Sequence, residues 1–219
     1  CFLVVGCSTV AATIFIFQTL PEAFVRCVNW LLMHTVYKVT VLELENVPKS
    51  GGALLVCNHA SFVDPSLLLG SLERPIRFLM FRPIYNTPGI HWFGKTMQAI
   101  PVSPFDKPEQ IADSLRDAQS RIKSGELVCI FAEGSITRTG NLLPFRKGFE
   151  RIMDGLDAPI IPVHIDRIWG SIFSFMNGRV LWKYPKRIPY PITITFGRRM
   201  PASSRTYEVR QAVQELSSE

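Results

Sequence analysis

Residues 54–69 read LLVCNHASFVDPSLLL, and this stretch decides the fold class. The apolar run from Leu54 to Val56 is typical of a buried strand. Pro65, followed by a serine and three leucines, is typical of the first turn of a helix. The polar residues between them therefore belong to a loop at the C-terminal end of a strand, which is where open α/β sheets place their ligands.

This loop contains a histidine and an aspartate, His59 and Asp64, five positions apart. A turn of this length lets the carboxylate fold back onto one imidazole nitrogen, which fixes the tautomer and makes the other nitrogen a general base for a hydroxyl. Asn58 and Ser61 are expected to brace the turn through side-chain to backbone hydrogen bonds. The alternative is that Asp64 is only a helix N-cap and His59 an ordinary loop residue.

A second apolar run, Leu127 to Ala132, ends directly at the polar sequence EGSITRTG, residues 133–140. If the two predicted strands are parallel neighbours, both polar clusters meet at one edge of the sheet. Glu133 is interpreted as orienting a basic or hydroxyl group, and Gly134 lets backbone N–H groups approach an anion closely. The side chains expected to hold that anion are Ser135, Thr137 and Arg138. The alternative is a polar turn with a solvated arginine.

The two motifs together resemble the first and third sequence blocks of the glycerolipid acyltransferase (1-acylglycerol-3-phosphate acyltransferase) family. These are NHASFVD at residues 58–64 and FAEGSITRTG at residues 131–140. Residues 78–94 are similar to the second block and residues 158–163 to the fourth, and this order argues against chance agreement. Members of the family move a fatty acyl group from a thioester to a glycerol hydroxyl, so the resemblance implies that reaction, with His59 as the base.

The third block departs from the commoner family form, in which arginine follows glycine by two positions, because Arg138 follows Gly134 by four. The form EGSITRTG is more similar to bacterial 2-acylglycerophosphoethanolamine acyltransferase domains of fused transporter and acyltransferase proteins. The resemblance implies lysophosphatidylethanolamine as acceptor, acyl carrier protein or coenzyme A as the carrier of the acyl donor, and a lysophospholipid transporter as a fused or associated partner. Arg82 is expected to bind the acceptor phosphate beside Arg138, and Arg82 or Lys147 to replace Arg138 if it does not.

Three other functions compete with this one. The first is a lysophosphatidic acid acyltransferase of de novo phospholipid synthesis, and the second is a lipid-binding module without catalysis. A serine hydrolase using Ser61 is disfavoured, because residues two apart on one loop rarely align as nucleophile and base and no Gly-x-Ser-x-Gly elbow is present. No metal or other cofactor is expected, since a thiolate is already a good leaving group.

The N-terminal segment is strongly apolar, and residues 2–20 carry no charge. That length is sufficient to cross a bilayer, so a spanning helix or a re-entrant hairpin is expected, with a buried core helix as the alternative. Residues 23–37 have apolar side chains at helical spacing and suit a helix in the membrane interface or packed on the sheet. The expected organisation is membrane-associated helices at 1–38 and a catalytic domain at 39–219.

Composition also favours a lipid surface, since the hydrophobic content is 47%, the mean hydropathy is +0.17 and the formal net charge is +6. No acidic residue lies between Arg167 and Tyr207, where basic and aromatic residues alternate. No nucleic-acid motif accompanies them, which disfavours nucleic acid as a partner. The resemblance implies the bacterial inner membrane, with the catalytic domain on its cytoplasmic side.

The remaining pattern alternates strands with helices. Strands are expected at 39–44, 160–165 and 192–196, and helices at 104–124 and 207–216. The expected fold is therefore α/β, with a mixed, mainly parallel sheet flanked by helices and preceded by a hydrophobic, membrane-associated helical segment.

Overall fold

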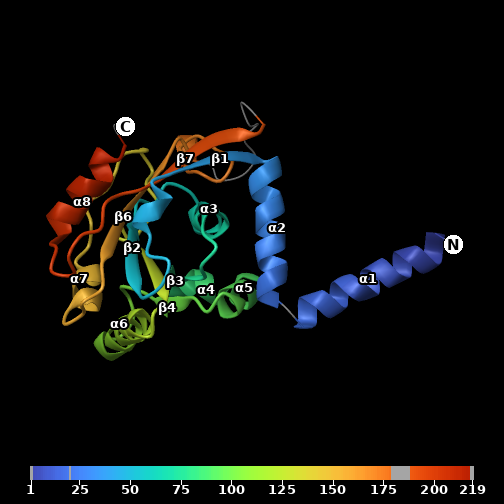
Figure 1. Ribbon diagram of the computed structural model, residues 1–219, viewed down its shortest axis with the longest axis horizontal. Coiled ribbons are helices and arrows are strands. Elements are labelled where there is room, and N and C mark those ends of the chain that lie inside the picture. The colour runs from blue at the N-terminus through green and yellow to red at the C-terminus, as the bar shows by residue number, and fades with distance from the viewer. Residues whose placement is uncertain (1, 20, 179–187, 218–219) are drawn as a thin grey trace.

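The computed structural model describes residues 2–19, 21–178 and 188–217, and its centre is a seven-stranded sheet with the strand order β1-β7-β6-β2-β5-β3-β4 (Figure 1). Every neighbouring pair is parallel except β6 and β7, which are antiparallel. The predicted α/β class with a mixed, mainly parallel sheet is confirmed. The strands are β1 (Tyr37–Leu42), β2 (Ala53–Cys57), β3 (Ile76–Phe81), β4 (Ile100–Val102), β5 (Leu127–Phe131), β6 (Ile160–Asp166) and β7 (Tyr190–Phe196).

Helices cover both faces of the sheet, and each face has its own core. Leu55 and Cys57 point to the core beneath α3, whereas Leu54 and Val56 point to the core beneath α6, α7 and α8. Strand β2 is therefore buried on both sides, which is why its sequence is continuously apolar rather than alternating. The helices are α1 (Phe2–Thr19), α2 (Pro21–Thr35), α3 (Asp64–Ser71), α4 (Arg82–Tyr85), α5 (Ile90–Thr96), α6 (Pro108–Lys123), α7 (Gly148–Met153) and α8 (Thr206–Glu215), with short 3-10 turns at Leu44–Asn46 and Met176–Gly178.

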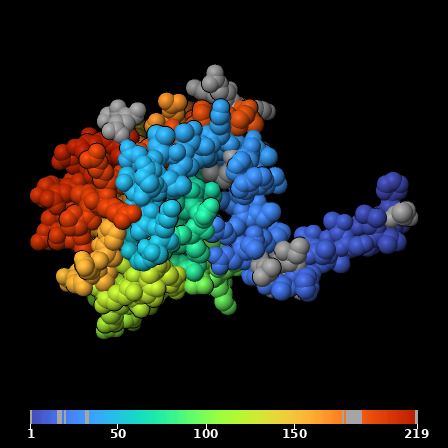
Figure 2. Space-filling model, in the orientation of Figure 1, coloured from blue at the N-terminus to red at the C-terminus, as the bar shows by residue number. Residues whose placement is uncertain are grey.

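The two N-terminal helices differ in how they meet the sheet domain. Helix α2 packs beside α3, where the Asn29 side chain donates to the Ser66 carbonyl at 2.8 Å, while its other face remains exposed. Helix α1 projects away from the body (Figures 1 and 2). Among the residues described, no helix combines the length and apolar character needed to cross a bilayer, so the expected spanning helix is not confirmed.

Some expected boundaries shift for local reasons. The helix expected from residue 104 begins at Pro108, because the Asp106 carboxylate accepts the Ser103 N–H at 2.8 Å and closes a turn before it. Proline at the first helical position then suits the start of α6. Part of the basic segment, residues 179–187, lies outside the described residues, and its expected contact with phospholipid stays a prediction.

Candidate active site

The two polar motifs leave the sheet side by side because their strands are parallel neighbours in register. Cys57 at the end of β2 lies opposite Phe131 at the end of β5. Backbone bonds then join the loops directly: the Thr137 N–H donates to the His59 carbonyl at 2.9 Å. The structure therefore brings the histidine loop and the glycine turn together at the edge where both strands end.

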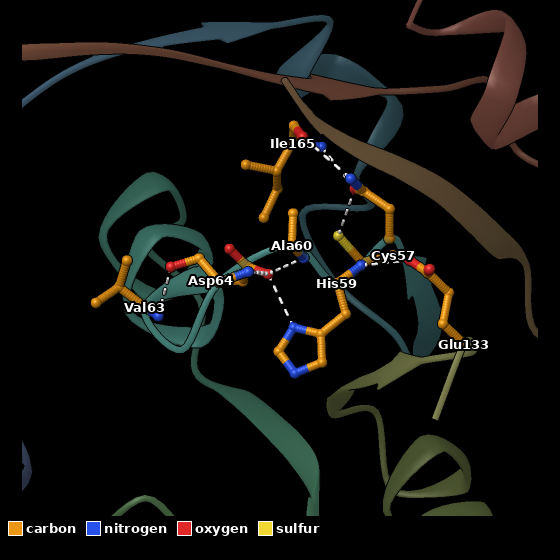
Figure 3. A network of polar contacts seen from close by, with 9 residues as sticks. Cys57, His59, Ala60, Val63, Asp64, Glu133 and Ile165 are labelled. Carbon is orange, nitrogen blue, oxygen red and sulfur yellow. Dashed lines mark hydrogen bonds and ion pairs between the residues drawn. The ribbon is translucent and has the colours of Figure 1, made fainter. Parts of the chain in front are cut away.

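The His59 ring is hydrogen-bonded to a fully buried carboxylate (Figure 3). Its Nδ1 lies 2.8 Å from Asp64 Oδ2, which also accepts the N–H groups of Ala60 at 2.8 Å and Ser61 at 2.9 Å. A carboxylate oxygen accepts all three bonds, so Nδ1 carries the proton and Nε2 presents its lone pair. Asp64 opens α3, yet its carboxylate binds the residues before the helix, so it is not merely an N-cap.

The second ring nitrogen, Nε2, points away from Asp64 and from the loop (Figure 3). The ring stacks on Phe131, with ring centroids 4.2 Å apart and planes inclined by 21°, and the His59 side chain is 18% exposed. A ring fixed on one edge by Asp64 and on one face by Phe131 presents a single nitrogen to a reactant. Sequence reasoning assigned no role to Phe131, although its position at the end of the second strand was the available signal.

Asn58 holds the loop to the neighbouring strand β6. Its side-chain nitrogen donates to the Ile165 carbonyl at 3.1 Å, and its oxygen accepts the Ile165 N–H at 2.8 Å. The Ser61 hydroxyl accepts the Val63 N–H at 3.4 Å. Both side chains therefore make side-chain to backbone contacts of the kind expected from the sequence.

The other nucleophilic side chains around His59 are buried. Ser61 has no exposed surface, and Cys57 and Cys129 lie inside the sheet. Burial raises the pKa of both thiols well above the ordinary cysteine value, which disfavours a thiolate. Burial therefore withholds Ser61, Cys57 and Cys129 from a reactant at the imidazole.

The Glu133 carboxylate links the histidine loop to the segment that follows the glycine turn. One carboxylate oxygen accepts the His59 N–H at 2.6 Å, and the other accepts the Leu143 N–H at 2.7 Å. The sequence suggested that Glu133 orients a basic or hydroxyl group. It orients backbone instead, and its partner Leu143 lies ten residues further along the chain.

The hydrogen bonds of Glu133 can be tested by comparing the pH dependence of stability in wild type and in Glu133→Gln. Burial raises the pKa of the Glu133 carboxyl, against the lowering effect of the two N–H donors. Stabilisation from such a group is fully present below its unfolded pKa, near 4.5, and is lost as the pH rises through the folded pKa. Wild type is therefore expected to gain free energy of unfolding relative to Glu133→Gln as the pH falls from about 7 to about 5. Urea unfolding of both proteins measures this difference, and a difference that is constant or opposite in sign would contradict it.

The glycine turn presents some of its predicted side chains and uses others internally. Gly134 has a φ of +70° and is exposed, as is Ser135. The Thr137 hydroxyl is buried and accepts the N–H groups of Thr139 at 3.3 Å and Gly140 at 3.2 Å, so it braces the turn. The Arg138 guanidinium is exposed and sits 5.4 Å from the centre of the Phe175 ring.

Arg82 is engaged by other groups. Its Nε donates to the Asp106 carboxylate at 2.8 Å, and its terminal nitrogen donates to the Pro101 carbonyl at 2.9 Å. Pro101 belongs to β4 and Asp106 follows it, and β4 is the edge strand that β3 separates from β5. These contacts direct Nε and one terminal nitrogen of Arg82 toward the β4 edge of the sheet. No described contact joins Arg82 to His59 or to the glycine turn.

A histidine held by a buried aspartate, next to a glycine turn at the edge of an α/β sheet, is an arrangement suited to acid–base catalysis of group transfer or hydrolysis. The chain belongs to the Acyltransferase family, whose model matches residues 38–166. It is 34% identical over 128 residues to the chloroplastic 1-acyl-sn-glycerol-3-phosphate acyltransferase BAT2 of Brassica napus, a match that covers 58% of this chain and 37% of the relative. It is 29% identical over 125 residues to the 1-acyl-sn-glycerol-3-phosphate acyltransferase of Bacillus subtilis, covering 57% and 60%.

The fold agrees with a solved relative. The crystal structure of the 1-acyl-sn-glycerophosphate acyltransferase PlsC from Thermotoga maritima superposes with a TM-score of 0.68 at 19% identity, covering 94% of this chain and 84% of that one. At this identity the likeness shows the fold alone. The match to the Brassica relative spans little more than a third of that protein's length. Among the described residues, no group of three His, Cys, Asp or Glu side chains is placed to hold a metal ion.

Proposed function

We propose that this chain transfers a fatty acyl group from a thioester donor to the free hydroxyl of 1-acylglycerol 3-phosphate. The observation that carries the proposal is the His59–Asp64 pair, in which a buried carboxylate holds Nδ1 and leaves Nε2 available as a base. Membership of the Acyltransferase family supports the reaction class, and the relatives named 1-acyl-sn-glycerol-3-phosphate acyltransferase support this acceptor.

The reaction runs by direct transfer. His59 Nε2 takes the proton of the acceptor hydroxyl while its oxygen forms a bond to the thioester carbonyl carbon. The tetrahedral intermediate collapses, the carbon–sulfur bond breaks, and the electron pair leaves with sulfur. The imidazolium returns its proton to the thiolate, so the enzyme regains its starting state and the products are an ester and a thiol. Asp64 stabilises the imidazolium between the two proton transfers.

The oxyanion of the intermediate needs hydrogen-bond donors, and two sources were expected from the sequence. The N–H groups of His59, Ala60 and Ser61 are already bound by the Glu133 and Asp64 carboxylates. The Gly134 N–H is also bound, to the Phe131 carbonyl at 3.0 Å. In the described part of the chain the N–H groups of Ser135 and Ile136 donate to no carbonyl or carboxylate, so these two groups of the glycine turn are the better source.

An acceptor panel tests the proposed function. Purified protein is incubated with a radiolabelled acyl thioester and, separately, 1-acylglycerol 3-phosphate, lysophosphatidylethanolamine, monoacylglycerol or buffer alone. We expect the highest kcat/KM with 1-acylglycerol 3-phosphate. Preference for lysophosphatidylethanolamine would support the acceptor implied by the EGSITRTG motif, and acyl release to water alone would overturn transferase activity. Running the panel with acyl carrier protein and with coenzyme A as carrier identifies the donor.

In the same proposal, α1 and the outward face of α2 rest on a lipid bilayer. Helix α1, which projects from the body (Figure 2), exposes most of its large apolar side chains, and α2 exposes two aliphatic side chains and an indole. Apolar surface of this extent is typical of contact with a membrane or another protein, and a lipid substrate favours the membrane. The exposed side chains are Phe2, Leu3, Val4, Val5, Val10, Ile14 and Phe15 on α1, with Val28, Trp30 and Leu31 on α2.

Placing carboxylates on α1 tests this membrane contact. The double variant Val5→Asp with Phe15→Asp is expected to bind vesicles of phosphatidylethanolamine and phosphatidylglycerol at least about tenfold more weakly, because two apolar contacts are lost. Tyr207→Asp, at a 69% exposed position on α8, is the matched control and should bind like wild type. Vesicle co-sedimentation measures the binding. Equal sedimentation of all three proteins would contradict the contact.

A further inference from the structure

The Arg146 side chain lies directly against the bare backbone of Gly134. A Cβ atom built on that glycine would be 2.6 Å from Arg146 Nε, 2.9 Å from Cδ and 3.1 Å from Cζ. The guanidinium therefore folds onto the glycine turn, in space that any other residue at position 134 would fill. Because Gly134 has no side chain, the Arg146 guanidinium can pack directly against the backbone of the turn.

The base of this arginine is fixed to the sheet. The Arg146 N–H donates to the Ala132 carbonyl at 2.8 Å, which ties the residue to the end of β5 directly before Glu133. Glu133 uses its two carboxylate oxygens on backbone N–H groups of other segments. Arg146 is exposed and, within the described part of the chain, has no carboxylate or carbonyl partner for its guanidinium. The cation is thus positioned by the backbone and available to a ligand.

Two other cations expected at the phosphate are placed differently. Arg82 is paired with Asp106, and Arg138 lies over the Phe175 ring. Arg146 is the cation that touches the turn, and the turn is bonded through Thr137 to the catalytic loop. Ser135, exposed and next to Gly134, adds a hydroxyl donor on the same turn. A guanidinium and a hydroxyl at one glycine turn are donors of the kind that bind a phosphate group.

We propose that Arg146, with the Ser135 hydroxyl, binds the phosphate of the acyl acceptor and so positions its free hydroxyl at His59. This inference rests on the proposed function and deepens it by naming the residue that selects a phosphate-bearing acceptor. Coenzyme A and the prosthetic group of acyl carrier protein also contain phosphate, so the same chemistry could serve the donor. The phosphate is assigned to the acceptor because the turn is hydrogen-bonded, through the Thr137 N–H, to the backbone of His59, whose imidazole activates the acceptor hydroxyl.

Steady-state kinetics of Arg146→Ala tests the assignment. The KM for 1-acylglycerol 3-phosphate is expected to rise about 10- to 100-fold, the range for losing charged hydrogen bonds, with kcat and the KM for the donor unchanged. Arg146→Lys keeps the positive charge but loses the planar guanidinium, which can donate two parallel hydrogen bonds, so an intermediate KM for 1-acylglycerol 3-phosphate is expected. With monoacylglycerol, which lacks phosphate, wild type and Arg146→Ala should have equal kcat/KM.

Arg151→Ala is the matched control, because Arg151 is also an exposed arginine and lies five residues further along the chain, on α7. It should leave every constant unchanged. An unchanged acceptor KM in Arg146→Ala, a rise in the donor KM instead, or an equal loss with monoacylglycerol would overturn the inference while leaving acyl transfer intact. If wild type acylates none of the acceptors, the proposed function fails, and calorimetric titration with sn-glycerol 3-phosphate decides the inference: binding lost in Arg146→Ala supports it, and no binding by wild type overturns it.

Discussion

Replacing His59 with alanine is expected to lower kcat for acyl transfer by about 10³-fold, within the range that general bases contribute. The imidazole is the group whose free nitrogen can take the acceptor proton (Figure 3), and the side chains of Ser61 and Cys57 on the same segment are buried. His59→Gln should lose as much activity, since its amide can bond to Asp64 but cannot act as a base. The pair of variants therefore separates proton transfer from the hydrogen bond.

Initial rates with saturating thioester and 1-acylglycerol 3-phosphate measure this loss. His91→Ala is the control, because that histidine is exposed on α5. Its ring packs edge-on against Tyr85, with the ring centroids 5.0 Å apart. The His91→Ala variant should retain wild-type activity. A His59 variant that turns over at the wild-type rate would remove His59 from the mechanism.

Asp64→Asn is expected to lower kcat by about 10² to 10⁴-fold with little change in acceptor binding. One oxygen of Asp64 accepts the imidazole and two backbone N–H groups, and an amide oxygen can still accept some of these bonds. The amide has no negative charge, so it no longer stabilises the imidazolium that forms when His59 takes the proton. The loss should therefore fall on kcat rather than on KM.

The control for the aspartate is Asp117→Asn on α6, an exposed carboxylate paired with Arg121 at 3.1 Å. It removes the same charge and should leave kcat unchanged. Circular dichroism of Asp64→Asn confirms that the loop change does not unfold the protein. A normal kcat in this variant would show that Asp64 serves only to shape the loop.

Local pattern was sufficient to predict the centre of the fold. The apolar run before Asn58 and the proline after Asp64 give β2, its loop and α3 from sequence alone. The run before Glu133 gives β5 in the same way. Because both strands are buried and parallel, the meeting of their loops follows from the sheet itself. The histidine and aspartate are five residues apart, so their contact is local and could be predicted as well.

Features that depend on distant pairing were not predicted. No element was assigned to the segment containing β3, α4, α5 and β4, whose short pieces are interrupted by Pro83 and Pro88 and show no sustained period. The bonds of Asn58 to Ile165 and the approach of the Arg146 side chain to Gly134 involve residues that the sheet brings together. Arg82 was expected at the phosphate, but its partner Asp106 follows the unassigned strand β4.

The central claim is that His59 activates the acceptor hydroxyl for direct transfer, and the fate of the acyl group tests it most directly. The protein is mixed with a radiolabelled acyl thioester, first alone and then with 1-acylglycerol 3-phosphate, and both protein and lipid are analysed by mass spectrometry. We expect unlabelled protein in the first sample and labelled 1,2-diacylglycerol 3-phosphate in the second. An acylated protein in the first sample, or label found only in free fatty acid, would contradict the mechanism.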